Sequence, residues 1–153
     1  MRSRSSASFG RRLVRAGGHP RLARRRQAVR VARGADGARR PGVDPGDTRH
    51  WAATFEQGIY VSAEEGRAWR ERDPTPNVRL AWHDSGDLFR IDPGGPVKVS
   101  KDGGETWEDR GSTGGEPQAL AVDQAGALYA ATLDGKVQKS EDGGKTFTAL
   151  VTP

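Results

Sequence analysis

The sequence predicts an all-β fold of about three four-stranded antiparallel units, and three observations support this prediction. Only 33% of the residues are apolar while Gly occurs 21 times, which favours short strands joined by tight turns. The segment SKDGGETW, which begins at Ser100, recurs as SEDGGKTF from Ser140, and an eroded copy, SAEEGRAW, begins at Ser62. The first serines of these copies lie 38 and 40 residues apart, and a period near 40 that holds several short strands is typical of a propeller blade.

The last unit shows the expected blade most completely. Strands are expected at 118–123 and 127–133, joined by a Gln-Ala-Gly turn. Asp134-Gly135 is a two-residue hairpin signal that leads into a third strand at 136–140. After the repeated turn, a fourth strand is expected at 146–150.

The two earlier units repeat this plan with decreasing clarity. In the middle unit strands are expected at 77–83, 87–91, 96–100 and 105–110. In the first unit they are expected at 51–55, 59–63 and 67–72, and WAATF at 51–55 matches YAATL at an offset of 78. An opening strand there would have to end near 42–45, after residues that are poor strand formers, so the pattern decays at this point.

Charge divides the chain into two parts. Residues 1–40 hold thirteen Arg, no Lys and one acid, for a net charge of +12, whereas residues 41–153 carry −7. We therefore expect 1–41 to be an Arg-rich segment that is disordered or arises from a misassigned gene start, and 42–153 to hold blades at about 42–73, 75–111 and 116–153. The alternative, nucleic-acid binding through the Arg-rich head, is disfavoured because Lys is absent and Phe9 is its only aromatic residue.

The repeated segment resembles the Asp-box, S-x-D-x-G-x-T-W, of BNR-repeat β-propellers. These include sialidases, other glycoside-hydrolase propellers, sorting-receptor ectodomains and a photosystem assembly factor. The resemblance, which is greatest to bacterial sialidase-like or glycosyl-hydrolase-like repeat proteins, spans roughly 42–150 and implies a C-terminal fragment of a larger propeller. The matching positions are Ser62, Gly66, Trp69, Ser100, Asp102, Gly104, Thr106, Trp107, Ser140, Asp142, Gly144, Thr146 and Phe147.

The chemistry of these positions indicates a structural role. An Asp carboxylate in a tight turn accepts backbone N–H bonds, Gly supplies positive φ, and the terminal aromatic ring covers the hairpin. In the first copy Glu64 replaces the Asp and Ala68 replaces the Thr, so weaker turn bonding is expected there. The alternative of a catalytic carboxylate pair is disfavoured because Asp102 and Asp142 belong to separate hairpins, and no catalytic residue is predicted.

Arg90 is a candidate ligand-binding residue, and Trp51 and Trp82, which are expected to pack between blades, are alternatives that could line a sugar-stacking surface. FRID at 89–92 resembles the F-R-I-P motif of sialidases, whose Arg binds the substrate carboxylate, and the resemblance implies a sugar-acid ligand for Arg90. Asp92 stands where that motif has Pro, and Phe89 already matches Tyr129 as a repeat position, so the repeat interpretation is favoured.

Neither a metal nor a cofactor is expected. The chain has no Cys, its three His are isolated, and no apolar run is long enough to span a membrane. Arg11-Arg12 lacks the apolar stretch of an export signal, so no signal peptide is predicted, although the parent family is often extracytoplasmic. The sequence leaves the cellular location open.

Three blades are too few to close a ring, so the expected partners are remaining propeller blades or further copies of this chain. The predicted function is a non-catalytic binding or scaffold module with a carbohydrate or protein ligand. The alternative is part of an active sialidase-type exo-glycosidase whose catalytic residues lie in missing blades.

Overall fold

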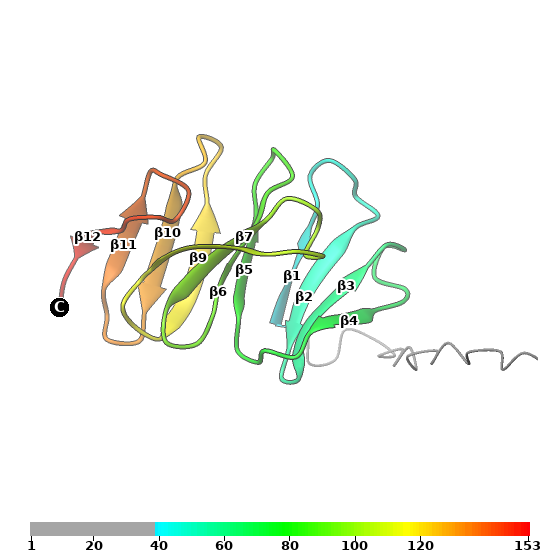
Figure 1. Cartoon of the computed structure of the whole chain (residues 1–153), viewed down its shortest axis with the longest axis horizontal. Helices are drawn as coiled ribbons and strands as arrows, with labels where there is room; N and C mark the ends of the chain where they lie inside the picture. The colour runs from blue at the N-terminus through cyan, green and yellow to red at the C-terminus, as the bar shows by residue number, and fades with distance from the viewer. Residues whose placement is uncertain (1–38) are drawn as a thin grey trace, which may run out of the picture.

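The computed structural model describes residues 39–153, which form twelve β-strands in three four-stranded antiparallel sheets. That range contains no helix, and the sheets lie side by side (Figure 1). Each strand pairs with its neighbour along the chain, so every sheet is a simple meander. We call the sheets blades 1, 2 and 3 in chain order, and these observations confirm the all-β prediction.

Blade 1 consists of β1 (Arg39–Val43), β2 (Trp51–Phe55), β3 (Gly58–Ser62) and β4 (Arg70–Asp73). Blade 2 consists of β5 (Arg79–Trp82), β6 (Leu88–Ile91), β7 (Pro96–Ser100) and β8 (Glu108–Ser112). Blade 3 consists of β9 (Pro117–Val122), β10 (Leu128–Thr132), β11 (Val137–Ser140) and β12 (Thr148–Val151). The repeated segments 62–69, 100–107 and 140–147, here called boxes 1, 2 and 3, connect the third strand of each blade to the fourth.

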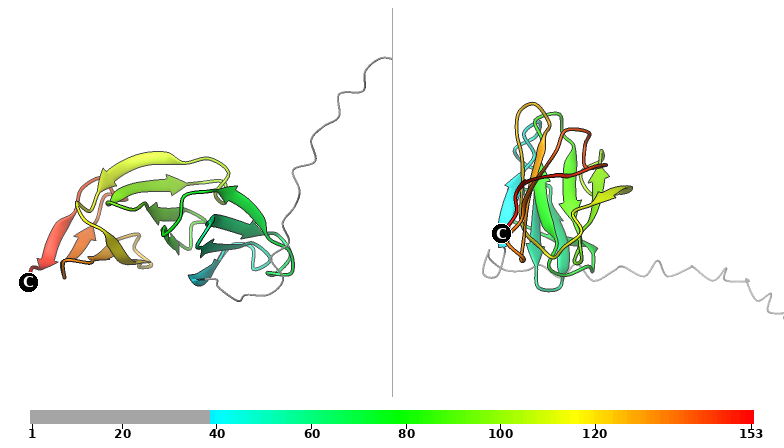
Figure 2. Two further views of the ribbon diagram at one scale, coloured as in Figure 1. Left: turned by 90° about the horizontal axis from the view of Figure 1, so that it is seen from below. Right: turned by 90° about the vertical axis from the view of Figure 1, so that its left-hand side faces the viewer.

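The blades are arranged in an open arc (Figure 2). Their first strands are adjacent, because β1 contacts β5 and β5 contacts β9. Three blades in an open arc form a partial β-propeller, which agrees with the predicted fold class.

The opening strand of blade 1 forms where the sequence pattern decays. It begins at Arg39, so the first sheet includes residues that the sequence assigned to the Arg-rich segment. Gly42 pairs with Ala52, and a Cβ on Gly42 would lie only 2.6 Å from Cδ1 of Trp82. The missing side chain therefore lets a blade 2 tryptophan pack directly on β1.

The fourth strands begin two to three residues later than the sequence predicts, at Arg70, Glu108 and Thr148. The reason is that the box turn continues as far as its terminal aromatic residue before the chain returns to the sheet. The aromatic residue thus belongs to the turn and not to the strand.

The register of β2 differs by one residue from the sequence alignment. Trp51 pairs with Ser62, whereas Leu128 and not Tyr129 pairs with Ser140. Trp51 therefore corresponds to Leu128, an offset of 77 instead of 78, because the β2–β3 hairpin is one residue shorter. A one-residue slip moves each side chain to the other face of the sheet.

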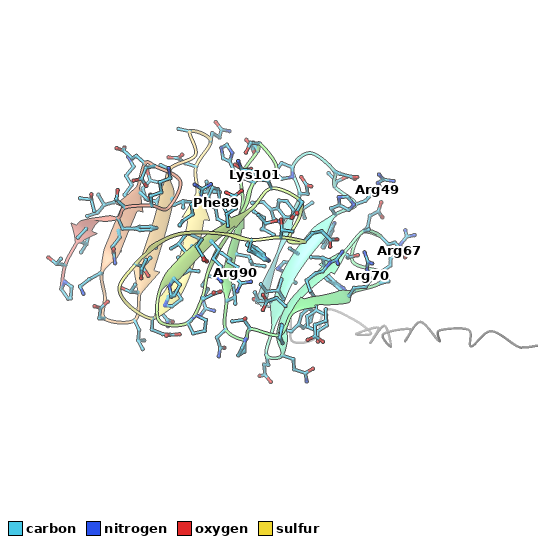
Figure 3. The ribbon with its side chains drawn as sticks, viewed as in Figure 1. Arg49, Arg67, Arg70, Phe89, Arg90 and Lys101 are labelled. Atoms are coloured by element: carbon cyan, nitrogen blue, oxygen red, sulfur yellow. The ribbon has the colours of Figure 1, made fainter. Side chains whose placement is uncertain are left out.

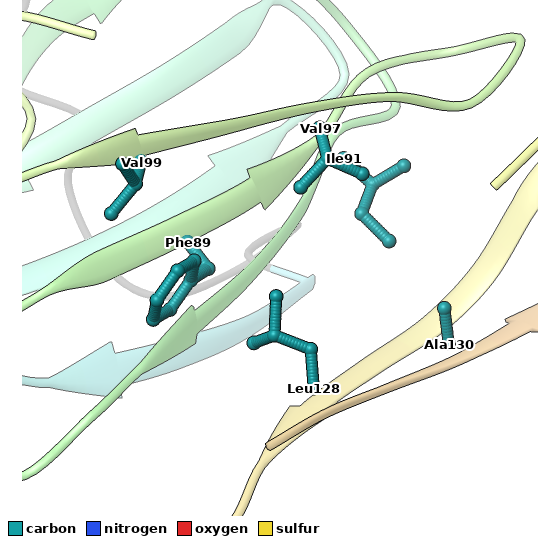
Figure 4. Packing of buried hydrophobic residues seen from close by; sticks show 6 residues of the cluster. All are labelled: Phe89, Ile91, Val97, Val99, Leu128 and Ala130. Atoms are coloured by element: carbon teal, nitrogen blue, oxygen red, sulfur yellow. The ribbon is translucent and has the colours of Figure 1, made fainter. Parts of the chain in front are cut away.

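The main core lies between blades 2 and 3 (Figure 4). Blade 2 contributes Phe89, Ile91, Val97 and Val99, and blade 3 contributes Leu128 and Ala130, all at most 6% exposed. A second cluster within blade 1 is aromatic and includes Trp51, Phe55, Tyr60 and Trp69. Apolar burial of this kind is the main stabilising contribution to the packing of the sheets.

Candidate functional site

Box 2 is held by a compact set of hydrogen bonds. The Ser100 hydroxyl accepts the Gly104 N–H (2.7 Å) and donates to Asp102 Oδ1 (2.7 Å). Asp102 Oδ1 also accepts the Thr106 N–H (2.9 Å), and its Oδ2 accepts the Thr106 hydroxyl (2.6 Å). Gly104 has φ 93°, a conformation that glycine adopts without strain.

Box 3 repeats this network almost bond for bond. Ser140 accepts the Gly144 N–H (2.9 Å) and donates to Asp142 (2.7 Å). Asp142 accepts the amide and hydroxyl of Thr146 (2.9 and 2.6 Å) and also the Lys145 N–H (2.9 Å). Two copies in different blades therefore build the same turn with the same residues.

The two carboxylates are stabilised in their ionised form by these bonds. Hydrogen bonds from the Thr106 hydroxyl and amide lower the pKa of Asp102. The equivalent bonds from Thr146 hold the pKa of Asp142 well below its ordinary value. Neither group is therefore suited to donate a proton near neutral pH, as a general acid must.

Box 1 has fewer turn bonds, as its sequence suggests. The Ser62 hydroxyl accepts the N–H groups of Glu64 (3.2 Å) and Gly66 (3.0 Å). Within residues 39–153, the Glu64 carboxylate takes no part in this turn, and Glu65 adopts φ 55°. Box 1 therefore keeps the serine bonds but lacks the bonds that join the aspartate to the threonine in boxes 2 and 3.

The boxes also lie at the contacts between blades. The Gly111 N–H of β8 donates to the Gly144 carbonyl of box 3 (2.8 Å). A Cβ on Gly144 would lie 2.8 Å from Cγ1 of Val97, so blade 2 packs directly against this glycine. Between blades 1 and 2, Arg72 of β4 forms an ion pair with Glu105 of box 2.

Arg90 is buried between blades 1 and 2, and only 2% of the residue is exposed. Its Nη1 donates to Asp73 of β4 (2.7 Å), its Nε donates to Asp92 (2.7 Å), and its guanidinium lies 4.8 Å from the ring centroid of Trp107. Figure 3 shows Arg90 in the middle of the molecule, whereas Arg49, Arg67 and Arg70 lie at the blade 1 end.

The charges around Arg90 stabilise one another. Burial opposes the charge of Arg90, but its bonds to Asp92 and Asp73 outweigh burial and raise its pKa. Burial likewise opposes ionisation of Asp73, but hydrogen bonds from Thr75 and Arg90 lower its pKa to about 2. The motif that suggested a sugar-acid ligand is thus occupied by two carboxylates of the chain itself.

A small pocket of about 110 Å³ lies where box 2 meets blade 1. It brings together Trp51 and Trp82, which are 31 positions apart in sequence, with the basic side chains of Arg70 and Arg72 and the carboxylate of Asp102. Sequence patterns do not reveal this pocket, because its residues come from four strands and two box turns. Its volume is about that of a few water molecules.

In residues 39–153 no three His, Asp or Glu side chains are placed to hold a metal ion. No helix in this range is long and apolar enough to cross a membrane. The expectation of nucleic-acid binding concerns residues 1–38, which lie outside the described residues, and stays untested.

Comparison with known proteins supports the fold and not a family. No protein-family model matches the chain, and no curated protein matches it. Among solved structures, it is similar to YCF48 bound to a D1 peptide (TM-score 0.63, 16% identity, 76% of this chain covered) and to an ancestral GH74 enzyme (TM-score 0.62, 16% identity, 76% covered). It is also similar to a chain of the nidogen/laminin complex (TM-score 0.60, 19% identity, 71% covered).

These neighbours are β-propeller proteins, and the chain spans 40%, 18% and 46% of their respective lengths. At such identities the similarity establishes the architecture alone. The chain therefore has the fold of part of a β-propeller.

Proposed function

We propose that this chain is a non-catalytic binding or scaffold segment of an Asp-box β-propeller. The observation that carries the proposal is that these acidic groups are bonded to other groups of the same chain. Asp102 and Asp142 accept three and four hydrogen bonds, respectively, from their own turns. Arg90, the candidate substrate ligand of the FRID segment, is paired with Asp73 and Asp92. Groups that are bonded in this way stabilise the folded chain, and we assign all three boxes a structural role.

A protein ligand is the partner class with the most support. Two neighbours are named for protein complexes, one with a D1 peptide and one with laminin. Propeller blades surround a central channel, which exists only when the ring is closed. The binding surface of this chain would then form together with remaining blades or with further copies.

A glycoside hydrolase is the second candidate, because three neighbours are GH74 enzymes. In that case this chain supplies blades to an enzyme whose catalytic residues lie elsewhere. Flanking DNA that encodes further blades with the catalytic groups of a sialidase, an arginine triad and a Tyr–Glu pair, would favour this candidate over a scaffold.

Hydrolysis assays test the proposal directly. The chain and its Arg90→Ala variant are assayed with a fluorogenic sialoside and a fluorogenic β-glucoside. We expect no release of fluorophore above the buffer control from either protein. Turnover by the unaltered chain that disappears in Arg90→Ala would overturn the scaffold proposal.

A further inference from the structure

The pocket between box 2 and blade 1 gathers side chains that the repeat does not require. Trp51 of β2 and Trp82 of β5 form its aromatic walls, and Arg70 and Arg72 of β4 line it beside them. Every lining residue belongs to blade 1, blade 2 or the turns within them. The pocket is therefore formed by this chain without further blades.

The next junction shows that three of these residues are additional to the repeat. Strand pairing assigns each of them an equivalent residue between blades 2 and 3. The equivalents of Trp51, Trp82 and Arg70 are Leu88, Val122 and Glu108, respectively. Blades 2 and 3 pack together with these residues, so a junction requires neither the two indole rings nor the guanidinium group.

One positive charge of the pocket has no counterion in the described part of the chain. Arg72 forms an ion pair with Glu105, and the carboxylate of Asp102 accepts three hydrogen bonds from its own turn. Arg70 is exposed, and its guanidinium forms no ion pair among residues 39–153. Burial and the neighbouring charge of Arg70 lower the pKa of Arg72, so a further negative charge near these two arginines is favoured.

Two N–H groups of the lining residues also lack a hydrogen-bond partner within 39–153. They are Nε of Arg72 and Nε1 of Trp82, and both nitrogen atoms are buried. A buried donor without a partner is destabilising until an acceptor reaches it. The lining therefore favours a ligand that accepts hydrogen bonds.

We propose that this pocket binds a carboxylate group on a short aliphatic chain, which comes from a small organic acid or from an acidic side chain of a peptide. A carboxylate accepts hydrogen bonds from guanidinium groups and matches the single unpaired charge of Arg70. The inference rests on the binding role proposed above, and it names the site and the chemistry of the ligand.

The size and the charge of the pocket fit this ligand. Its volume of about 110 Å³ holds a group as large as a few water molecules, and the indole rings give the aliphatic carbons an apolar contact. A phosphate would bring a second negative charge close to Asp102 and Glu105, which also line the pocket. A singly charged carboxylate is therefore favoured over a phosphate.

The test titrates the 153-residue chain with sodium propionate at constant ionic strength and follows the indole N–H signals of its four tryptophans by NMR. We expect saturable shifts of the Trp51 and Trp82 signals. The signals of Trp69 and Trp107, which do not line the pocket, should shift little. Arg70→Gln should weaken binding about tenfold or more, because it removes a charge-assisted hydrogen bond.

Two further variants separate the site from a general effect of charge. Arg67→Gln is the matched control, since Arg67 is an exposed arginine of box 1 outside the pocket (Figure 3), and it should leave binding unchanged. Arg70→Lys keeps the charge and should bind propionate more tightly than Arg70→Gln. Circular dichroism checks that each variant is folded.

A blocked tripeptide, acetyl-Gly-Glu-Gly-amide, identifies the source of the carboxylate. Binding about tenfold tighter than that of propionate assigns the site to a peptide, whereas equal or weaker binding assigns it to a small acid. The same tripeptide with Gln in place of Glu is the neutral control and should not bind.

Three results would overturn the inference. They are the absence of saturable shifts, unchanged binding by Arg70→Gln, and equal binding of the Glu and Gln tripeptides. None of them alters the hydrolysis result, so failure of the carboxylate site is distinguishable from failure of the scaffold proposal.

Discussion

The two junctions between blades belong to the same repeat, but one is mainly apolar and the other is charged. Blade 2 meets blade 3 through an apolar cluster and a glycine-to-glycine backbone bond. Blade 1 meets blade 2 through a buried guanidinium shared by two carboxylates and an aromatic ring. The difference shows that the repeat specifies the sheets, whereas single residues decide how neighbouring sheets are joined.

One position accounts for this difference. Arg90 pairs with Lys98 in its sheet, just as Ala53 pairs with Tyr60 and Ala130 with Gln138. The equivalent residue is therefore alanine in blades 1 and 3. Replacing a small residue by arginine introduces a charge that must be paired when buried.

The largest effect is expected from Arg90→Ala, which breaks the charged junction and leaves a cavity. We expect a loss of about 3 to 5 kcal/mol in the free energy of unfolding, as for other buried ion pairs that lose one partner. Arg90→Met, which keeps the volume over Trp107, should cost clearly less. Urea unfolding followed by tryptophan fluorescence measures both. Equal losses in the two variants would mean that the charge and not the filled space determines stability.

A somewhat smaller effect is expected at the other junction from Gly111→Ala. Its new Cβ would lie 2.1 Å from the Lys145 carbonyl oxygen, so the two blades must move apart. We expect a loss of about 2 to 3 kcal/mol. Gly46→Ala is the control, because its Cβ would meet only Asp44 Oδ1 at 3.4 Å, and it should change stability little. Thermal unfolding measures both variants, and a lower melting temperature for Gly46→Ala than for Gly111→Ala would contradict this packing.

A gain in stability is expected from repairing box 1. The double change Glu64→Asp with Ala68→Thr restores the residues that bond in boxes 2 and 3. We expect an increase of about 1 kcal/mol, the usual contribution of a net hydrogen bond. Glu64→Asp alone should give less, because its hydroxyl partner is missing. Denaturant titration of the double variant measures its free energy of unfolding. No increase would show that the residues of boxes 2 and 3 do not form the same bonds in box 1.

The smallest expected effect is on the loss of stability at acidic pH. The pKa of Asp73 is lowered to about 2 in the folded chain, against about 3.9 when unfolded. Its stabilising contribution is therefore fully present above about pH 3.9 and is lost as the pH falls through about 2. Asp73→Asn should show a shallower loss of stability over this interval than the unaltered chain. Thermal melts at stepped pH measure the slope of melting temperature against pH. Identical slopes for the two proteins would show that Asp73 does not stabilise the junction.

The sequence predicts what is local and misses what is assembled across blades. Most strands and the turn bonding of boxes 2 and 3 follow from short motifs, because serine, aspartate, glycine and threonine act on backbone groups within four residues. The pairing of Arg90 with Asp73 joins residues 17 positions apart on different sheets, and no local pattern encodes it.

The same distinction explains the opening strand of blade 1, where the sequence pattern decays. β1 is built from residues with weak strand preference, and it forms because β2 offers a ladder and Trp82 packs on Gly42. Likewise, alignment placed Trp51 one residue away from its true register, since hairpin length is fixed by pairing and not by composition.

The central claim is that the box aspartates serve architecture, and the stability of Asp142→Ala tests it most directly. Glu141→Ala removes the same charge from the adjacent position, where the side chain is 76% exposed, and serves as the control. A structural aspartate predicts a loss of about 1 to 2 kcal/mol for Asp142→Ala and almost none for Glu141→Ala. Unchanged or increased stability of Asp142→Ala would contradict the account, since that is the behaviour of residues retained for activity.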